Sequence, residues 1–455
     1  MKTRIAMIGA GSGFSLGVAT PLCKSGILRD ATFVLMDPNA ERVENMGRQV
    51  RDVAAKAGAA LQVETTTDLR RALEGARFVV SACEKNRGPY WIRDLEIPRA
   101  HGVHQLLGEN GGPGGQAHAL RNITMFMEIC AAIREVAPDA WLLNFTNPVS
   151  FICTYLQKRS GVKSPGFCHQ VHGSFGVVAE MLGFEPGELQ VITGGINHMN
   201  FLMDIRKRGT GESFKEEFFQ RVRTSEWWQK NRPLIPEQTF TLEMLDAFGV
   251  YPVGYDGHIV EYIPFFHEQE RWAELNFKPF DVELRKYMEY DRRKKEAREK
   301  AEADPKETHL QKVEMQVERF PFPRDPDHPY YKEDPAYVME ALLTNTPAYF
   351  DAMVLVNHGA IDNLPDDAVV DVPALVVGGE ARGVHVGALP PFAAELCRRQ
   401  IAIHELVVEA AMTGDRQIAL QAMALDPYVR SITQAKNILA DFLEAYREEL
   451  PQFQR

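Results

Sequence analysis

Short apolar runs and longer amphipathic stretches alternate along the first 200 residues of the chain. The apolar runs have the length and composition of buried strands, which we expect at Arg4–Ile8, Thr32–Met36, Phe78–Ser81, Trp141–Phe145 and Pro165–Cys168. Helices are expected between them, for example over Ala40–Lys56 and Ala117–Val136. This alternation predicts an α/β fold in which helices cover both faces of a mostly parallel sheet.

The alternation ends near residue 190, and the pattern beyond it indicates a helix-rich, irregular region. A charged stretch at Glu283–Lys306 is typical of a solvated helix, and a proline-rich irregular segment follows from Phe320 to Tyr331. Two amphipathic helices are expected near Pro391–Met412 and Val429–Tyr446. We therefore expect two closely packed domains, residues 1–195 and 196–455.

Composition and charge narrow the classes of partner. The 455 residues include 51 Lys and Arg against 62 Asp and Glu, a formal net charge of −11, and no basic run. This balance argues against nucleic-acid or anionic-membrane partners and favours small molecules. There is no run of about 18 apolar residues and no secretory leader pattern. The six cysteines contain no CxxC pair, which is typical of reduced thiols, so we expect a cytoplasmic enzyme.

A glycine-rich turn directly follows the first expected strand. In Gly9–Phe14, Gly9 and Gly11 fit the first two glycines of the G-x-G-x-x-G pattern, but Phe14 occupies the place of the third. A strand, a tight glycine turn and a helix N-terminus can hold a pyrophosphate with backbone N–H groups. A glycine turn with only a geometric role remains the alternative.

The second strand strengthens the prediction of a dinucleotide site. It ends at Asp37, where an acidic side chain can bind the ribose 2′-hydroxyl of NAD. No Lys or Arg directly follows Asp37 to receive a 2′-phosphate, so NAD is favoured over NADP. The alternative is that Asp37 caps the helix that follows. The residues expected at the cofactor are Gly9, Gly11, Ser12, Gly13, Phe14 and Asp37.

Three polar clusters follow expected strands or lie soon after them. They are Asn144–Val149, Cys168–Gly173 and Gly194–Asn200. Ligands of doubly wound sheets bind beyond the carboxyl ends of the strands. Cysteine and histidine together can hold a divalent metal and leave positions open for substrate oxygens. A buried cysteine that only fills space and a structural histidine are the alternatives.

Taken together, these motifs resemble those of the family-4 glycoside hydrolases, and the likeness covers nearly the whole chain. Its segments are Gly9–Ser12, Gly108–Gly115, Thr146–Pro148, Cys168–His169, Asn197–His198, Val356–Pro365 and Gly387–Pro390. The resemblance implies a Rossmann-like, lactate/malate-dehydrogenase-like N-terminal domain and a mixed α+β C-terminal domain. It also implies a homodimer or homotetramer.

The resemblance further implies an NAD- and Mn²⁺-dependent glycosidase that does not use the usual pair of carboxylates. In that mechanism NAD oxidises C3 of the sugar, a base removes the C2 proton, and a divalent metal holds the oxygens at C2 and C3. The glycosidic oxygen leaves by elimination, water adds at C1, and the hydride returns.

Site roles follow from the same resemblance. Cys168 and His198 match the metal ligands, and His169 matches the leaving-group acid. Tyr255 matches the base, with Asp256 as the alternative. Arg93 and Asn147 match positions that contact sugar hydroxyls or the cofactor. His258 and Glu261 either line the same pocket, where His258 would contact the substrate, or only pack within it.

The sequence around Cys168 is closer to the unphosphorylated α-glycosidase branch than to the 6-phosphosugar branch. We therefore expect an α-linked hexoside or hexuronide as substrate. An NAD-dependent dehydrogenase of the 2-hydroxyacid type is the alternative enzyme, and a dinucleotide-sensing protein is the non-enzymatic alternative.

Overall fold

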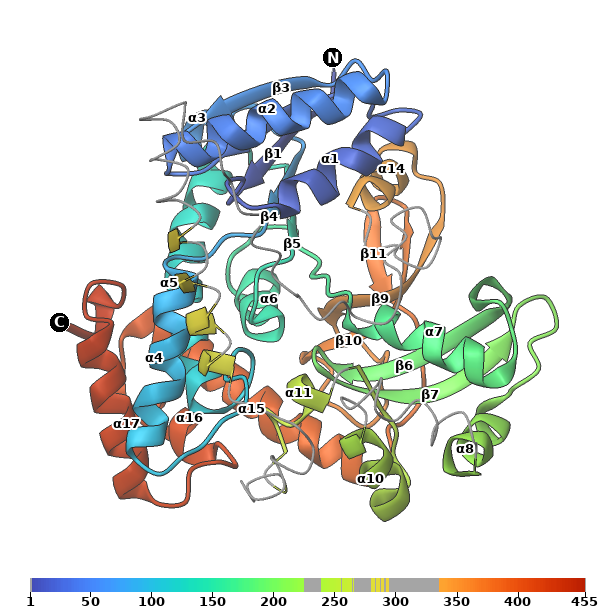
Figure 1. Ribbon diagram of the computed structural model, residues 1–455, viewed down its shortest axis with the longest axis vertical. Helices are drawn as coiled ribbons and strands as arrows, with labels where there is room; N and C mark the ends of the chain where they lie inside the picture. Colours follow the sequence, from blue (N-terminus) through green and yellow to red (C-terminus); the bar gives the residue numbers. More distant parts are fainter. Residues whose placement is uncertain are drawn as a thin grey trace.

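A five-stranded parallel sheet organises the N-terminal part of the computed structural model (Figure 1). The structure describes residues 2–224, 239–254, 256–263, 265, 280–282, 284–286, 288–289, 292–293 and 335–454. The strand order is β3-β2-β1-β4-β5, which is the order of a dinucleotide-binding fold. The strands are β1 (Arg4–Ile8), β2 (Thr32–Met36), β3 (Gln62–Thr66), β4 (Phe78–Ser81) and β5 (Trp141–Asn144). The predicted Rossmann-like sheet is thus confirmed.

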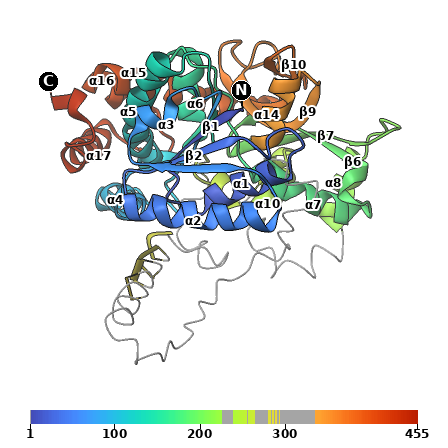
Figure 2. The same ribbon diagram turned by 90° about the horizontal axis from the view of Figure 1, so that it is seen from above.

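Alternate residues of β1, β2, β4 and β5 are buried on opposite faces of this sheet. Ile5 and Met7 of β1 lie in one apolar cluster, whereas Ala6 and Ile8 lie in the other. Figures 1 and 2 show helices on both faces. One cluster includes residues of α1 (Phe14–Lys24), α2 (Ala40–Lys56) and α14 (Pro335–Thr344); the other includes residues of α3 (Leu69–Leu73), α5 (Gly112–Val136) and α6 (Val149–Lys158).

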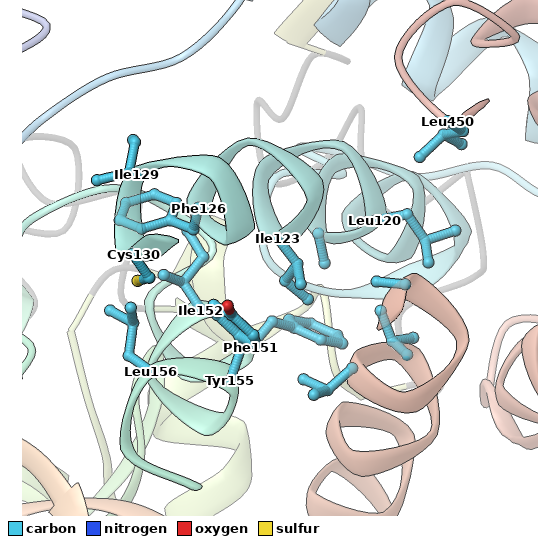
Figure 3. Close-up of a cluster of buried hydrophobic side chains, with 14 of the residues drawn as sticks. Leu120, Ile123, Phe126, Ile129, Cys130, Phe151, Ile152, Tyr155, Leu156 and Leu450 are labelled. Atoms are coloured by element: carbon cyan, nitrogen blue, oxygen red, sulfur yellow. The ribbon is translucent and has the colours of Figure 1, made fainter. Parts of the chain in front are cut away.

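Helices from the C-terminal end complete this second cluster. The helices α15 (Pro391–Thr413), α16 (Arg416–Leu425) and α17 (Ile432–Ala445) contribute to the same apolar cluster as α5 and α6. Figure 3 shows Phe126 of α5 beside Phe151 and Ile152 of α6, and all three are essentially fully buried. Residues far apart in the sequence therefore share one core.

A second, antiparallel sheet follows the parallel one. Its order is β11-β10-β6-β7-β8, with β9 paired to β10. The strands are β6 (Leu189–Ile196), β7 (Met199–Lys207), β8 (Pro252–Val253), β9 (Ala348–Val356), β10 (Val369–Val377) and β11 (Glu380–Gly383). The helices around it are α7 (Gln170–Leu182), α8 (Lys215–Thr224), α10 (Thr239–Phe248) and α11 (Asp256–Ile259). The expected helices are present after residue 190, but they accompany a sheet that the pattern did not predict. The mixed α+β C-terminal domain implied by the resemblance is confirmed.

Several element boundaries differ from those predicted. Residues 165–168 form no strand, since Gly166 makes only isolated bridges, to Asn144 and Val354. Helix α5 begins at Gly112 instead of Ala117, with a proline in its first turn, where the missing N–H costs nothing. The two predicted C-terminal helices are confirmed as α15 and α17, although α16 was missed.

Other predictions are tested less directly. The proline-rich segment 320–331 and most of the charged stretch 283–306 lie outside the described residues. The division at residues 195 and 196 falls at the end of β6 and stays a prediction. Within the described ranges, no helix has the length and apolar character needed to cross a membrane.

Candidate active site

The glycine turn after β1 packs closely on the neighbouring strand ends. The N–H groups of Gly9 and Ala10 both donate to the carbonyl of Met36, at 3.0 and 2.9 Å. Gly9 has φ of +83°, and a Cβ there would lie 2.4 Å from the carbonyl oxygen of Ala82. The turn leads into α1, whose first residue Phe14 packs its ring on Phe145 (centroids 5.1 Å apart). No side chain caps α1, which is the arrangement found where a helix N-terminus receives a phosphate.

Asp37 binds the glycine turn instead of capping α2. Its Oδ2 accepts a hydrogen bond from the N–H of Gly11 at 2.9 Å, and its Oδ1 accepts one from Asn39 at 2.9 Å. The residue that caps α2 is Asn39, whose side chain accepts from the N–H of Arg42. The alternative role of Asp37 as a simple helix cap is therefore not what the structure shows.

Cys168 and His198 meet although thirty residues separate them. The Sγ atom of Cys168 lies 3.2 Å from Nε2 of His198. Cys168 follows the segment that extends β5, and His198 lies in the two-residue turn between β6 and β7. His198 is 3% exposed and has a φ of +67°, a left-handed conformation that is uncommon outside glycine. Burial, with the charges of His258 and His169, lowers the pKa of His198 well below its usual value, so its imidazole is neutral.

A third and a fourth donor lie beside this pair. The rings of His198 and His258 are 4.0 Å apart between centroids, and Nδ1 of His258 lies 3.6 Å from Oε2 of Glu261. One donor atom from each of His198, His258 and Glu261 falls within 4.8 Å of the others. Nδ1 of His198 and Oε2 of Glu261 are buried and have no hydrogen-bond partner among the described residues. This set of neutral nitrogen, thiol and carboxylate donors suits a divalent transition metal.

Glu261 is held in place by the start of α5. Its Oε1 accepts hydrogen bonds from the N–H groups of Glu109 and Asn110, at 2.5 and 3.0 Å. This contact accounts for the glycine at position 111, because a Cβ there would lie 2.6 Å from the carbonyl oxygen of Glu261. Burial raises the pKa of the Glu261 carboxyl.

The predicted acid and bases occupy different environments. His169 is exposed and occupies the N-cap position of α7, next to Cys168, but its side chain makes no capping hydrogen bond. Tyr255 lies outside the described residues. Asp256 is fully buried, and its carboxylate accepts hydrogen bonds from the N–H groups of Phe240 and Thr241 and from the Thr241 hydroxyl, at 2.7, 3.0 and 2.8 Å. Asp256 therefore holds the start of α10.

Asn147 and Arg93, both expected to contact sugar hydroxyls or the cofactor, lie in different surroundings. Asn147 follows β5 at a cis bond to Pro148, and its Oδ1 is buried without a hydrogen-bond partner among the described residues. Its carbonyl accepts from the side chain of Asn122 at 2.7 Å. Arg93 is exposed, and its guanidinium lies 3.5 Å from the carbonyl of Ala445. No contact of Arg93 with the Cys168 cluster is found among the described residues.

A charge network next to the site, buried except at Arg87, was missed from the sequence. His118 of α5 forms a 3.0 Å ion pair with Glu84, and Arg87 bonds both Glu84 and Glu109, at 2.6 and 2.7 Å. Burial opposes ionisation of Glu84, but the charge of His118 and its hydrogen bond prevail and lower the pKa of Glu84 to about 2. The only part of the sequence that pointed to this network was the polar motif at residues 108–115. The motif did not indicate which charged residues pair with one another.

The sequence matches known families along almost its whole length. Residues 4–184 match the family 4 glycosyl hydrolase model, and residues 193–429 match the family 4 glycosyl hydrolase C-terminal domain. The chain therefore belongs to glycosyl hydrolase family 4, and the resemblance seen in its motifs is confirmed.

Individual relatives align with almost the whole length of the chain. An α-glucosidase of Erwinia rhapontici is 29% identical over 94% of each chain. The crystal structure of the putative glucosidase lplD from Bacillus subtilis is 25% identical, with a TM-score of 0.78 over 97% of this chain and all of that one. A 6-phospho-α-glucosidase from gut microorganisms, solved with NAD and Mn²⁺, is 22% identical (TM-score 0.77, 99% of this chain and all of that one) and shows the fold alone. A malate dehydrogenase of Cryptosporidium parvum shares the fold more distantly, at 11% identity and a TM-score of 0.52 over 90% of this chain and 99% of that one.

Proposed function

We propose that this glycosidase cleaves α-linked glycosides of an unphosphorylated hexose or hexuronic acid, with NAD and a divalent metal, Mn²⁺ by preference, as cofactors. The observation that carries the proposal is the contact between Cys168 and His198 beside His258 and Glu261. A conventional glycosidase needs two carboxylates across the glycosidic bond and has no use for a thiol next to a neutral imidazole.

The residues at the end of β1 and β2 fit NAD. The uncapped start of α1 offers N–H groups for a pyrophosphate, and no atom lies within 4 Å of a Cβ built at Gly13, so this surface is open. Asp37, fixed by Gly11, presents a carboxylate suited to ribose hydroxyls. NAD bound there would supply a reversible hydride acceptor for C3 of the sugar.

Cys168 and His198 would hold the metal, with Glu261 and His258 as neighbouring donors. The metal would supply Lewis-acid stabilisation of the charge that develops on the sugar oxygens. Glu261 is suited to this position because one oxygen is bonded to the start of α5 while the other lies beside His258.

The chain's own residues would move the protons. We assign the removal of the C2 proton to Tyr255, since the three hydrogen bonds accepted by Asp256 support a structural role for that carboxylate. His169, exposed beside Cys168, would protonate the leaving oxygen, a task for which imidazole is suited near neutral pH. Asn147 would offer its buried amide oxygen to a sugar hydroxyl or to the cofactor.

The preference for an unphosphorylated α-glycoside is supported by the sequence after Cys168 and by the α-glucosidase relative. A hexuronide, in which a carboxylate replaces the hydroxymethyl group of the hexose, is the other substrate that we propose. We further propose that the protein forms a homodimer or homotetramer.

A panel of nitrophenyl α- and β-glycosides tests the function. It should include glucosides, galactosides, galacturonides and 6-phosphoglucosides, each assayed under reducing conditions with and without NAD and Mn²⁺. We expect release of nitrophenol from an unphosphorylated α-glycoside only when both cofactors are present, without net NADH. Cofactor-independent hydrolysis would contradict the mechanism, and net formation of NADH would indicate a dehydrogenase instead.

A further inference from the structure

Gln170 joins the three chain segments that provide the proposed metal donors. It is the first residue of α7, two positions after Cys168, and it is 3% exposed. Its Nε2 atom lies 3.3 Å from the carbonyl oxygen of Val253 and 3.5 Å from that of His198. One side chain thus reaches both the β6–β7 turn and the end of β8.

The backbone at Gly254 is shaped to receive this side chain. Gly254 has φ of +126°, and a Cβ built there would lie 2.0 Å from Nε2 and 2.5 Å from Cγ of Gln170. The amide of Gln170 therefore occupies the space that a side chain at position 254 would fill. Gln170 and Gly254 are therefore in direct contact.

The residues that follow the Gln170 contact are also anchored by the carboxylates of Asp256 and Glu261, whereas the strand before it is short. Strand β8 has two residues, which pair with β7 as Asn200 with Val253 and Phe201 with Pro252. Helix α11, which carries His258, starts at Asp256, directly beyond the Gln170 contact. Gln170 thus contacts the backbone at Val253 and Gly254, shortly before the helix that carries His258.

We propose that Gln170 is a positioning residue of the metal site, which ties the His258 and Glu261 segment to the Cys168 and His198 segments. The inference rests on the metal site of the proposed function. An amide suits the task because its two N–H groups can serve two carbonyl acceptors at once. Replacement of a side chain that orients a metal ligand without binding the metal itself typically changes the metal affinity 10- to 100-fold. We expect a change of about this size for Gln170.

Substitution of Gln170 by methionine tests this role, since methionine has a similar length and volume but no donor. Binding of Mn²⁺ alone would be followed by electron paramagnetic resonance in the absence of substrate, and NAD binding by fluorescence. Gln157→Met is the matched control, because Gln157 also donates to a strand carbonyl, that of Val354 at 2.8 Å, but makes no contact with the site.

We expect Gln170→Met to weaken Mn²⁺ binding by about 10- to 100-fold while the NAD dissociation constant stays within about twofold, and Gln157→Met to leave both unchanged. Unchanged Mn²⁺ affinity in Gln170→Met would overturn the proposal. Equal loss of Mn²⁺ and NAD affinity would also overturn it, since it would show that Gln170 serves the fold as a whole.

The titration separates this inference from the proposed function. Wild-type protein that binds Mn²⁺ but hydrolyses no glycoside would refute the proposed activity and leave the Gln170 comparison valid. Wild-type protein that binds no Mn²⁺ would refute the metal site and the role of Gln170 together.

Discussion

The carboxylate of Asp37 accepts a hydrogen bond from the backbone N–H of Gly11, so the ends of β1 and β2 are joined at the place where a dinucleotide would bind. The contact fixes the carboxylate rotamer, because its second oxygen is bonded to the N–H of Asn39. Asp37 is therefore preorganised for hydroxyl groups.

We expect Asp37→Ala to weaken NAD binding by roughly 1–3 kcal/mol, the range for loss of a charged hydrogen bond. Isothermal titration would measure it. Asn39→Ala is the control: it removes the α2 cap and should lower the free energy of unfolding by about 1 kcal/mol without changing NAD affinity. Unchanged NAD binding in Asp37→Ala would show that its only role is to fix the turn.

Cys168→Ser and His198→Ala should each abolish turnover, since each removes a proposed metal ligand. NAD affinity should stay within several-fold of wild type, because the glycine turn lies on other strand ends. Cys130→Ala, in the α5 core, is the control and should retain activity. Full activity of either site variant in metal-free buffer would exclude the metal assignment.

Reaction in D₂O should place deuterium at C2 of the released sugar, because the proposed base removes the C2 proton and solvent returns it. Mass spectrometry or NMR of the product would detect it. Tyr255→Phe should abolish both exchange and turnover. Product without deuterium would rule out elimination, whereas exchange that persists in Tyr255→Phe would move the role to another base such as Asp256.

Asp426 should make stability depend on pH. Burial raises the pKa of its carboxyl to about 7, against hydrogen bonds from Gln116 and Tyr428 and the charge of Arg399 that lower it. The folded state thus holds this proton more tightly than the unfolded state does, and the contribution to stability falls as pH rises from about 4 to about 7. Relative to wild type, Asp426→Asn should gain about 2–4 kcal/mol across that window. Denaturant unfolding at pH 5 and pH 8 would show it, and a constant difference at both pH values would contradict it.

The sequence predicted four of the five strands of the parallel sheet, because β1, β2, β4 and β5 are short apolar runs between amphipathic helices. The polar strand β3, with the sequence QVETT, was missed. The sequence did not predict the antiparallel sheet. Strands β6 and β10 each contain interruptions, Thr193–Gly195 and Asp371–Pro373, that weaken the apolar pattern. Asp371 is nevertheless buried, because it accepts a hydrogen bond from the side chain of Asn197.

The candidate site was foreseen only in part, for a similar reason. The Cys168 and His198 pair was implied by local motifs matched to a family, and the structure brings the two together. The contacts of Glu261 with Glu109 and of Gln170 with Val253 join residues more than eighty positions apart. The fold brings such residues together, and no periodic pattern in the sequence indicates that they will meet.

The shared core of α5 and α15 sets the order in which this chain can finish folding during synthesis. The apolar face of α5 leaves the ribosome early, but the helices at residues 391–445 that cover it are made much later. Until then a growing chain carries a large uncovered apolar surface next to an otherwise completed sheet, the kind of intermediate that aggregates or binds chaperones. Shielding of that surface during translation would therefore govern how much active enzyme a cell obtains.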